Sequence, residues 1–175
     1  MMSWIGQNPE GGAPAQTVEA AAFREAMSRM GAAVHVVTTA GVGGKSGFTA
    51  TALCSVSDAP PTLLVCLNSS SQITPVLREN GVFCVNTLGA DDAAIADIFA
   101  GRTGVFMADR FATGTWTSLK TGSPVFASAV VAFDCRVTDV KGVGSHNVIF
   151  GTVEAMRLGQ SGPVLLYHDR AYKQV

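Results

Sequence analysis

The sequence predicts a mainly β protein, an antiparallel barrel with about three helices packed outside it. Two observations carry this prediction. Seven or eight segments have the alternation or β-branched composition of strands, whereas only three have helical periodicity. Several links between the strand segments are also too short to hold a crossover helix, which parallel strands would need. A doubly wound parallel sheet is therefore not expected.

The amino-acid composition narrows the class of protein. Hydrophobic residues make up 47% of the 175 residues and charged residues only 14%, so apolar material is in surplus. We therefore expect a homodimer, because a subunit interface would bury part of that surplus. The formal charge of −1 argues against nucleic acid as a partner. No apolar run approaches the roughly 20 residues of a membrane helix, so no membrane association is expected.

The cysteines and the N-terminus indicate a reducing compartment. Cys54, Cys66, Cys84 and Cys135 form no CxxC pair, so we expect buried free thiols and no metal site. The first residues lack the basic and apolar regions of a signal peptide. A cytoplasmic location is therefore expected.

The N-terminal part begins with a tail and a helix. Residues 1–16 are rich in Gly, Pro and small polar residues and are predicted to be disordered, so the domain is expected to span residues 17–175. A helix is predicted over Val18–Met30, with Thr17 as its N-cap and Gly31 as its stop. Helical spacing of its apolar side chains predicts one buried face, made by Val18, Ala22, Phe23, Ala26, Met27 and Met30.

Three strands are predicted next, over Ala33–Thr39, Phe48–Val56 and Thr62–Asn68. A Gly-rich loop makes the first two a hairpin. Pro60 and Pro61 are assigned to the connection between the second and the third, because proline cannot donate to a strand ladder.

The middle of the chain alternates helix and strand. A short helix is predicted over Gln72–Glu79, with an Asn-Gly pair to end it, and a buried strand over Val82–Leu88. Asp91 or Asp92 caps a third helix, which Gly101 ends. The inner face of this helix is expected to consist of Ile95, Ile98 and Phe99.

The last third is predicted to be irregular over Arg102–Val125, with one short strand. Strands follow over Ala129–Thr138 and His146–Met156, and the chain closes with one further strand and a short tail. In the first of these strands, Asp134 and Arg136 are expected to face away from the apolar side, which is made by Val131, Phe133, Cys135 and Val137.

Residues 46–71 have the composition of a ligand-binding edge. Their two strands carry small and hydroxyl side chains where most strands carry bulky ones. Small side chains let a flat molecule approach the backbone closely, and hydroxyl and amide groups can then hydrogen-bond it. We therefore interpret this stretch as the edge of a cofactor site.

The common phosphate-binding motifs are missing. No GxxxxGK[ST] loop and no GxGxxG fingerprint occurs in the sequence. An alternative site is Ser69–Ser71 at the start of a short helix, where hydroxyls and free N–H groups favour an anion. An equally good interpretation is that Ser71 only caps that helix.

His146 is the histidine best placed for a function. It follows a Gly-Val-Gly-Ser turn and opens a strand, which puts its ring at a barrel rim, where an imidazole can donate a hydrogen bond. His35 lies within a strand and His168 near the end of one, so both also have structural interpretations. No GxSxG elbow or activating cysteine signature predicts a nucleophilic enzyme.

Five segments resemble the flavin reductase family, which has an FMN-binding split-barrel fold. In chain order they are GFTATALCSVSDAPPTLLVCLNSSS, FCVNTL, DRF…W, FDCRV and VGSHNVIFGTVEAM. The resemblance runs from about Phe23 to Tyr172 and implies a split β-barrel of the Greek-key antiparallel type. The sequence is similar to the reductase components of two-component flavin monooxygenases, of the 4-hydroxyphenylacetate and pyrimidine-utilisation types. It is also similar to cob(II)yrinic acid a,c-diamide reductase.

The resemblance also implies a homodimer and a cofactor site. FMN or FAD would be the flavin, and NADH or NADPH the co-substrate. His146 would be the catalytic residue, near the nicotinamide. The implied flavin-binding residues are Thr49, Ala50, Thr51, Ala52, Ser55, Val56, Ser57, Cys66, Leu67, Asn68, Ser70, Ser71, Asn86, Phe99 and Arg102.

One residue departs from the family pattern. Relatives often have Arg directly after the Asn of the LNxSS motif, whereas this chain has Ser69. A phosphate group carries about two negative charges near neutral pH, so its cationic partner must come from elsewhere. Arg102, Lys45 and Arg78 are the candidates.

Three functions fit these observations. The main hypothesis is an NAD(P)H:flavin oxidoreductase that supplies reduced flavin to a partner monooxygenase. The second keeps the flavin bound and passes electrons to another acceptor, such as a cobalt corrin. The third is a flavin- or haem-binding module without turnover, with His35 or His168 as the axial haem ligand.

Overall fold

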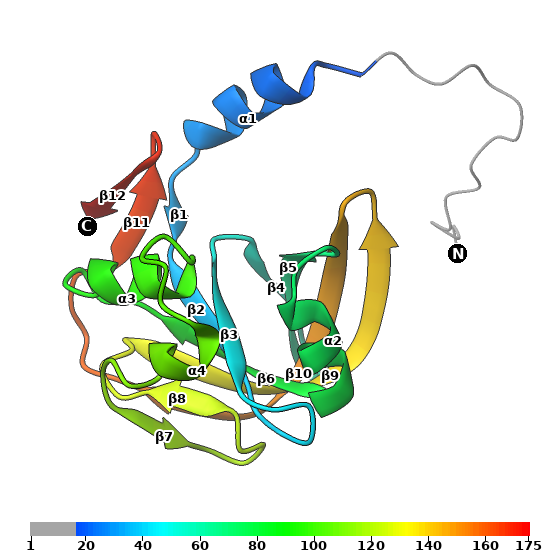
Figure 1. Cartoon of the computed structure of the whole chain (residues 1–175), viewed down its shortest axis with the longest axis vertical. Helices are drawn as coiled ribbons and strands as arrows, with labels where there is room; N and C mark the ends of the chain where they lie inside the picture. The colour runs from blue at the N-terminus through cyan, green and yellow to red at the C-terminus, as the bar shows by residue number, and fades with distance from the viewer. Residues whose placement is uncertain (1–16) are drawn as a thin grey trace, which may run out of the picture.

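The computed structural model describes residues 17–175, and within them it has a curled seven-stranded sheet, two smaller sheets and four helices (Figure 1). All strand pairs are antiparallel. The mainly β prediction is therefore confirmed. The tail expected over residues 1–16 lies outside the described residues.

The elements follow one another in a simple order. The helices are α1 (Ala20–Ser28), α2 (Ile73–Asn80), α3 (Ala93–Phe99) and α4 (Met107–Arg110). The strands are β1 (Ala32–Ala33), β2 (His35–Thr39), β3 (Ser46–Ala50), β4 (Leu53–Asp58), β5 (Pro61–Asn68), β6 (Val82–Thr87), β7 (Trp116–Ser118), β8 (Pro124–Phe126), β9 (Val131–Val143), β10 (His146–Leu158), β11 (Leu165–His168) and β12 (Ala171–Gln174).

The connection between β3 and β4 explains why the large sheet curls. The strand order is β3-β2-β6-β9-β10-β5-β4, so the two edge strands are consecutive in the sequence. Only Thr51 and Ala52 connect them. A link this short cannot separate the two strand ends by more than about 11 Å. The edges must therefore meet, and the sheet closes into a split barrel.

Two apolar clusters lie on the two faces of the barrel wall. The interior cluster includes Val37, Phe48 and Phe83, and it draws side chains from both ends of the strand order. The outer cluster places Ile95 and Phe99 of α3 against the opposite face of β2. Every residue of β2 is consequently buried.

The predicted burial of the first helix is wrong for this chain. The helix forms, but none of its residues is buried, and Figure 1 shows α1 projecting beyond the barrel. Phe23 is 56% exposed, Met27 45% and Met30 62%. An exposed apolar stripe of this kind marks a surface that contacts something else.

Several predicted strand boundaries also differ. The strand expected over Phe48–Val56 is divided into β3 and β4, because the chain crosses from one sheet edge to the other at Thr51 and Ala52. The strand expected over Ala33–Thr39 is divided into β1 and β2. Pro61 opens β5, so only Pro60 lies in the connection.

The segment predicted to be irregular contains α4 and the β7–β8 hairpin, which raises the helices from the expected three to four in the described chain. The C-terminal segment forms a hairpin of β11 and β12 instead of one strand. Asp169 and Arg170 make its turn with φ angles of 51° and 59°. Non-glycine residues rarely adopt such angles, so this turn was not expected from the residue types.

The loop between β7 and β8 contacts the face of β9 on which Asp134 lies. Asp134 faces away from the interior cluster as predicted, yet its exposed fraction is 0%. Its carboxylate accepts hydrogen bonds from the backbone N–H and the hydroxyl of Thr121 in the loop between β7 and β8. A buried carboxylate needs such donors.

Two of the four cysteines are buried in the barrel wall and are unreactive. Burial raises the pKa of Cys84 above its usual range and the pKa of Cys135 to about 12, so neither is a thiolate near neutral pH. Cys54, in contrast, is exposed, and Cys66 is half-buried.

None of the helices formed by residues 17–175 has the length and apolar character needed to cross a membrane.

The buried imidazole of His35 predicts a loss of stability in acid. Burial lowers the pKa of His35 to about 4, whereas the unfolded chain takes up this proton near 6.5. The unfolded state therefore binds more protons between these values, and stability should fall as the pH drops through this window, by on the order of 3 kcal/mol.

Urea unfolding of the wild type and of His35→Gln at a series of pH values tests this prediction. Because glutamine does not titrate, the difference in unfolding free energy between the two proteins should change between pH 6.5 and 4. A difference that stays constant through this window would contradict the assignment.

Candidate functional site

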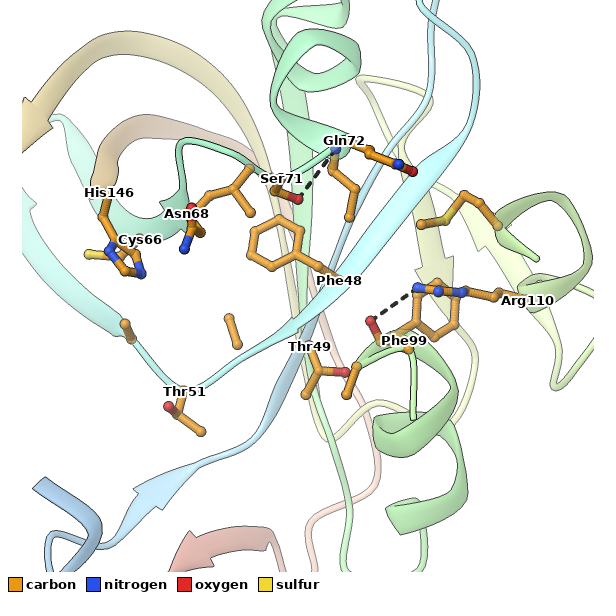
Figure 2. A pocket seen from close by; sticks show the side chains of 17 residues that line it. Phe48, Thr49, Thr51, Cys66, Asn68, Ser71, Gln72, Phe99, Arg110 and His146 are labelled. Carbon is orange, nitrogen blue, oxygen red and sulfur yellow. Dashed lines mark hydrogen bonds between the residues drawn. The ribbon is translucent and has the colours of Figure 1, made fainter. Parts of the chain in front are cut away.

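A cavity of about 510 Å³ lies where β3, the β3–β4 connection, β5 and the start of α2 meet the end of α3 (Figure 2). Much of the stretch singled out in the sequence lines it. The predicted site residues among its lining are Thr49, Ala50, Thr51, Ala52, Cys66, Leu67, Asn68, Ser71, Phe99 and His146.

The β3–β4 connection lines this cavity and has backbone N–H groups without a partner among the described residues. Thr51 and Ala52 belong to no strand, and both are exposed. Their carbonyl groups accept bonds from the N–H groups of Leu53 and Cys66. Their own N–H groups donate to no acceptor within residues 17–175. Two neighbouring free donors beside small side chains can bind the carbonyl edge of a flat ring.

Asn68 supplies a side-chain donor at the end of β5. Its Oδ1 accepts bonds from the backbone N–H and the hydroxyl of Ser70, at 2.9 and 2.8 Å. This turn fixes the amide, so that Nδ2 is the group left for a ligand, and Figure 2 shows Asn68 beside His146 at the cavity. Ser70 itself does not line the cavity but supports a residue that does.

His146 lies across the sheet from Asn68, because the two residues are directly paired between β10 and β5. The imidazole is exposed, and its Nδ1 lies 2.9 Å from the hydroxyl of Ser145. This contact orients the ring, with Nε2 as the nitrogen free to reach a substrate.

Ser71 lies just before α2. Its hydroxyl accepts a bond from the backbone N–H of Ile73 at 3.3 Å. The N-cap of α2 is Gln72 and no side-chain capping bond is made there, so Ser71 lies one residue before the cap and the expected capping role is not confirmed. The hydroxyl still lies on the cavity wall, so a contact with a ligand remains a prediction.

Five other predicted residues do not line the cavity. Ser55, Val56 and Ser57 lie on the edge strand β4, where they are exposed. Arg102 lines a smaller neighbouring pocket and forms an ion pair with Asp97 at 2.9 Å. Asn86 is the fifth.

The structure gives Asn86 a structural role instead of a cofactor contact. It is fully buried in β6, and its Oδ1 accepts a bond from the backbone N–H of Phe126 at 2.8 Å. Its Nδ2 donates to the carbonyl group of Val36 at 3.0 Å. The side chain therefore ties β8 to β2 through the barrel wall.

Several lining residues were not predicted. They are Phe48, Gln72, Ile73, Ala100, Gly101, Met107 and Arg110. Arg110 belongs to the DRF motif that supported the resemblance, but its segment was predicted to be irregular, so no position could be assigned to it. Met107 lies in the same segment, and the other five lie within two residues of predicted ones, so a wider window around each motif would have included them.

Neither candidate haem ligand lies at this cavity. His35 is buried, with its Nδ1 3.0 Å from the hydroxyl of Thr87. His168 lies on the C-terminal hairpin, with its Nδ1 2.8 Å from Nζ of Lys173. The geometry gives no support to a haem-binding module.

Comparisons with known proteins identify the family. The family model described as "Flavin reductase like domain" matches residues 27–175. The chain belongs to the flavin reductase family. An FMN reductase (NADH) RutF 1 from Methylorubrum extorquens strain PA1 is 52% identical over 161 residues, which cover 92% of this chain and 79% of that protein.

Solved structures agree with this family and with the fold. A flavin reductase crystal structure from Haemophilus somnus 129PT is 40% identical, with a TM-score of 0.86, and the match covers 90% of this chain and 100% of that one. BorF, the flavin reductase component of a bacterial two-component tryptophan halogenase, is 26% identical, with a TM-score of 0.83 and coverage of 90% and 98%. The split-barrel prediction is confirmed.

The donor set of the cavity fits a flavin. The isoalloxazine ring is flat and apolar, with a carbonyl edge that accepts hydrogen bonds. The free N–H groups of Thr51 and Ala52 suit that edge, and small side chains beside them permit close approach. Asn68 and Arg110 add a neutral donor and a cation for the polar part of the molecule.

Two asparagines provide a matched test of this site. Asn86→Ala should lower the free energy of unfolding by about 1–3 kcal/mol, because a buried N–H group loses its acceptor, while FMN affinity stays unchanged. Asn68→Ala should weaken FMN binding instead, because it removes a donor at the cavity. Urea unfolding and fluorescence titration with FMN measure the two effects. Weaker FMN binding by a stably folded Asn86 variant would contradict this division of roles.

Proposed function

We propose that this flavin reductase oxidises NADH and reduces FMN. The observation that carries the proposal is the pair of free backbone N–H groups at Thr51 and Ala52, in a cavity that also contains His146. The relative from Methylorubrum extorquens, whose name states FMN and NADH, supports the choice of both substrates over FAD and NADPH.

When bound, the flavin supplies the hydride-accepting chemistry. The protein's residues bind the flavin and the nicotinamide and orient them. The N–H groups of Thr51 and Ala52 would hold the carbonyl edge of the ring and stabilise the negative charge that it gains on reduction. Asn68 would donate to the polar chain through Nδ2. His146 would position the nicotinamide or move a proton, with its ring held by Ser145.

The reduced flavin is proposed to leave for a partner monooxygenase. Thr51, Ala52, Asn68 and His146 are all exposed in this chain, so the cavity does not enclose its ligand. The halogenase relative is named as a reductase component, which supports a two-component system here as well. A cytoplasmic location, where reduced nicotinamides and free thiols coexist, belongs to the same proposal.

A homodimer is also part of the proposal. The apolar stripe of α1, made by Phe23, Met27 and Met30, has no partner within residues 17–175. A groove between α1 and the barrel includes Met27 and Met30 and reaches Thr51 and Ala52 at the cavity. A second copy that covers this groove would bury the stripe and border the flavin site.

Anaerobic addition of NADH to the protein with FMN tests the activity. We expect the visible flavin absorption to bleach, and FMN to be more effective than FAD. His146→Ala should lower the turnover number roughly ten- to hundredfold while FMN affinity changes little, because the ring positions the second substrate. No bleaching with any flavin or nicotinamide would refute the reductase function. Unchanged turnover in the variant would remove His146 from the mechanism.

Light scattering tests the dimer. The wild type should have twice the chain mass of 18.1 kDa. Met27→Glu should shift it toward the monomer, because the substitution buries a charge in the interface. Ala21→Glu, on a different face of the same helix, is the matched control and should stay dimeric. A wild-type mass near that of one chain would rule the interface out.

A further inference from the structure

The proposed cavity needs a cation. A flavin or nicotinamide nucleotide brings phosphate charge that must be matched or left in water. Among the described residues that line the cavity, Arg110 is the only one with a permanent charge. None of the three cations expected from the sequence is part of this lining.

Those three cations are engaged elsewhere. Arg102 pairs with Asp97 and lies between the rings of Tyr167 and Tyr172. Lys45 lies over the ring of Phe111, with Nζ 5.2 Å from its centroid. Arg78 lines a separate apolar cavity between α2 and the β9–β10 hairpin.

Arg110 is held in place by neutral acceptors. Its Nε donates to the carbonyl group of Val105 at 3.1 Å, and its Nη1 donates to the carbonyl group of Phe99 at 3.3 Å. No carboxylate within residues 17–175 lies at ion-pair distance from it. The guanidinium is therefore oriented but keeps its full charge, and Nη2 remains for a ligand.

The surroundings of Arg110 are well packed and leave room for that ligand. Phe111 follows it directly and packs edge-to-face against Phe99 and Trp116, with ring centroids 5.1 Å from each. Gly101 faces the guanidinium, and a Cβ atom there would lie 3.3 Å from Nη2. Its φ of +76° also favours glycine. Figure 2 shows Arg110 and His146 on opposite sides of the cavity.

We propose that Arg110 binds a phosphate group of a nucleotide substrate in this cavity, an inference that rests on the proposed function. A guanidinium with free donors is well suited to phosphate oxygens. Ser71, the other candidate, is neutral, and its hydroxyl already accepts a bond from the backbone N–H of Ile73. The phosphate belongs to the flavin or to the nicotinamide dinucleotide, and the two sources are separated by measurement.

Calorimetric titration of the flavin-free protein with FMN and with riboflavin is the test, since riboflavin lacks the phosphate. Arg110→Gln should weaken FMN binding roughly tenfold to a hundredfold and leave riboflavin binding unchanged. Arg110→Lys, which keeps the charge, should recover part of the loss. Arg78→Gln removes a charge at the separate cavity and should bind FMN as the wild type does.

The other outcomes are equally decisive. NADH dependence is measured separately, in a turnover assay: if Arg110→Gln binds FMN normally in the titration but has a raised KM for NADH in that assay, the phosphate is that of the dinucleotide. If FMN and riboflavin are weakened equally, or neither FMN nor NADH is affected, the proposal is overturned. These titrations contain no NADH, so a protein that binds FMN through Arg110 but never oxidises NADH would contradict only the proposed function.

Discussion

The two-residue link between β3 and β4 is the constraint on which the rest of the structure depends. It joins the two edges of a seven-stranded sheet, so the sheet can only exist as a barrel. Thr51 and Ala52 cross from one edge strand to the other and belong to neither ladder. Their N–H groups therefore have no acceptor within residues 17–175. The step that closes the fold therefore also creates the donors of the site. Small side chains are required at Thr51 and Ala52, because larger ones would prevent β3 and β4 from approaching each other and would exclude the ligand.

Much of this arrangement was predictable because it is local. Strand alternation, the turn before His146 and the hydroxyl-rich stretch around Thr51 are visible in short windows of sequence. Long-range packing was not. Asn86 was predicted to be a site residue. Only the position of β8 shows that its side-chain amide is hydrogen-bonded within the barrel wall. Arg102 and Arg110 are likewise indistinguishable in sequence, and only the fold shows that Arg102, which follows α3, pairs with Asp97 while Arg110 of α4 lies at the cavity.

The cavity divides its tasks between backbone and side chains. The end near Thr51 and Ala52 offers uncharged backbone N–H donors from the β3–β4 connection. Such donors suit a flavin ring that gains negative charge on reduction. Arg110 places a positive charge on the opposite side from His146. A groove that includes Met27 and Met30 also reaches Thr51 and Ala52, so the proposed dimer interface would border the proposed flavin site.

The most direct test of the central claim is to follow the backbone amide signals of Thr51 and Ala52 by ¹⁵N–¹H NMR during titration with FMN. Hydrogen bonding to the ring should move both signals strongly and slow the exchange of their protons with solvent. Signals elsewhere on the barrel, such as that of Asn86, should move little. If FMN binds while Thr51 and Ala52 keep their free-protein shifts and exchange rates, the β3–β4 connection is not the flavin site and the account fails.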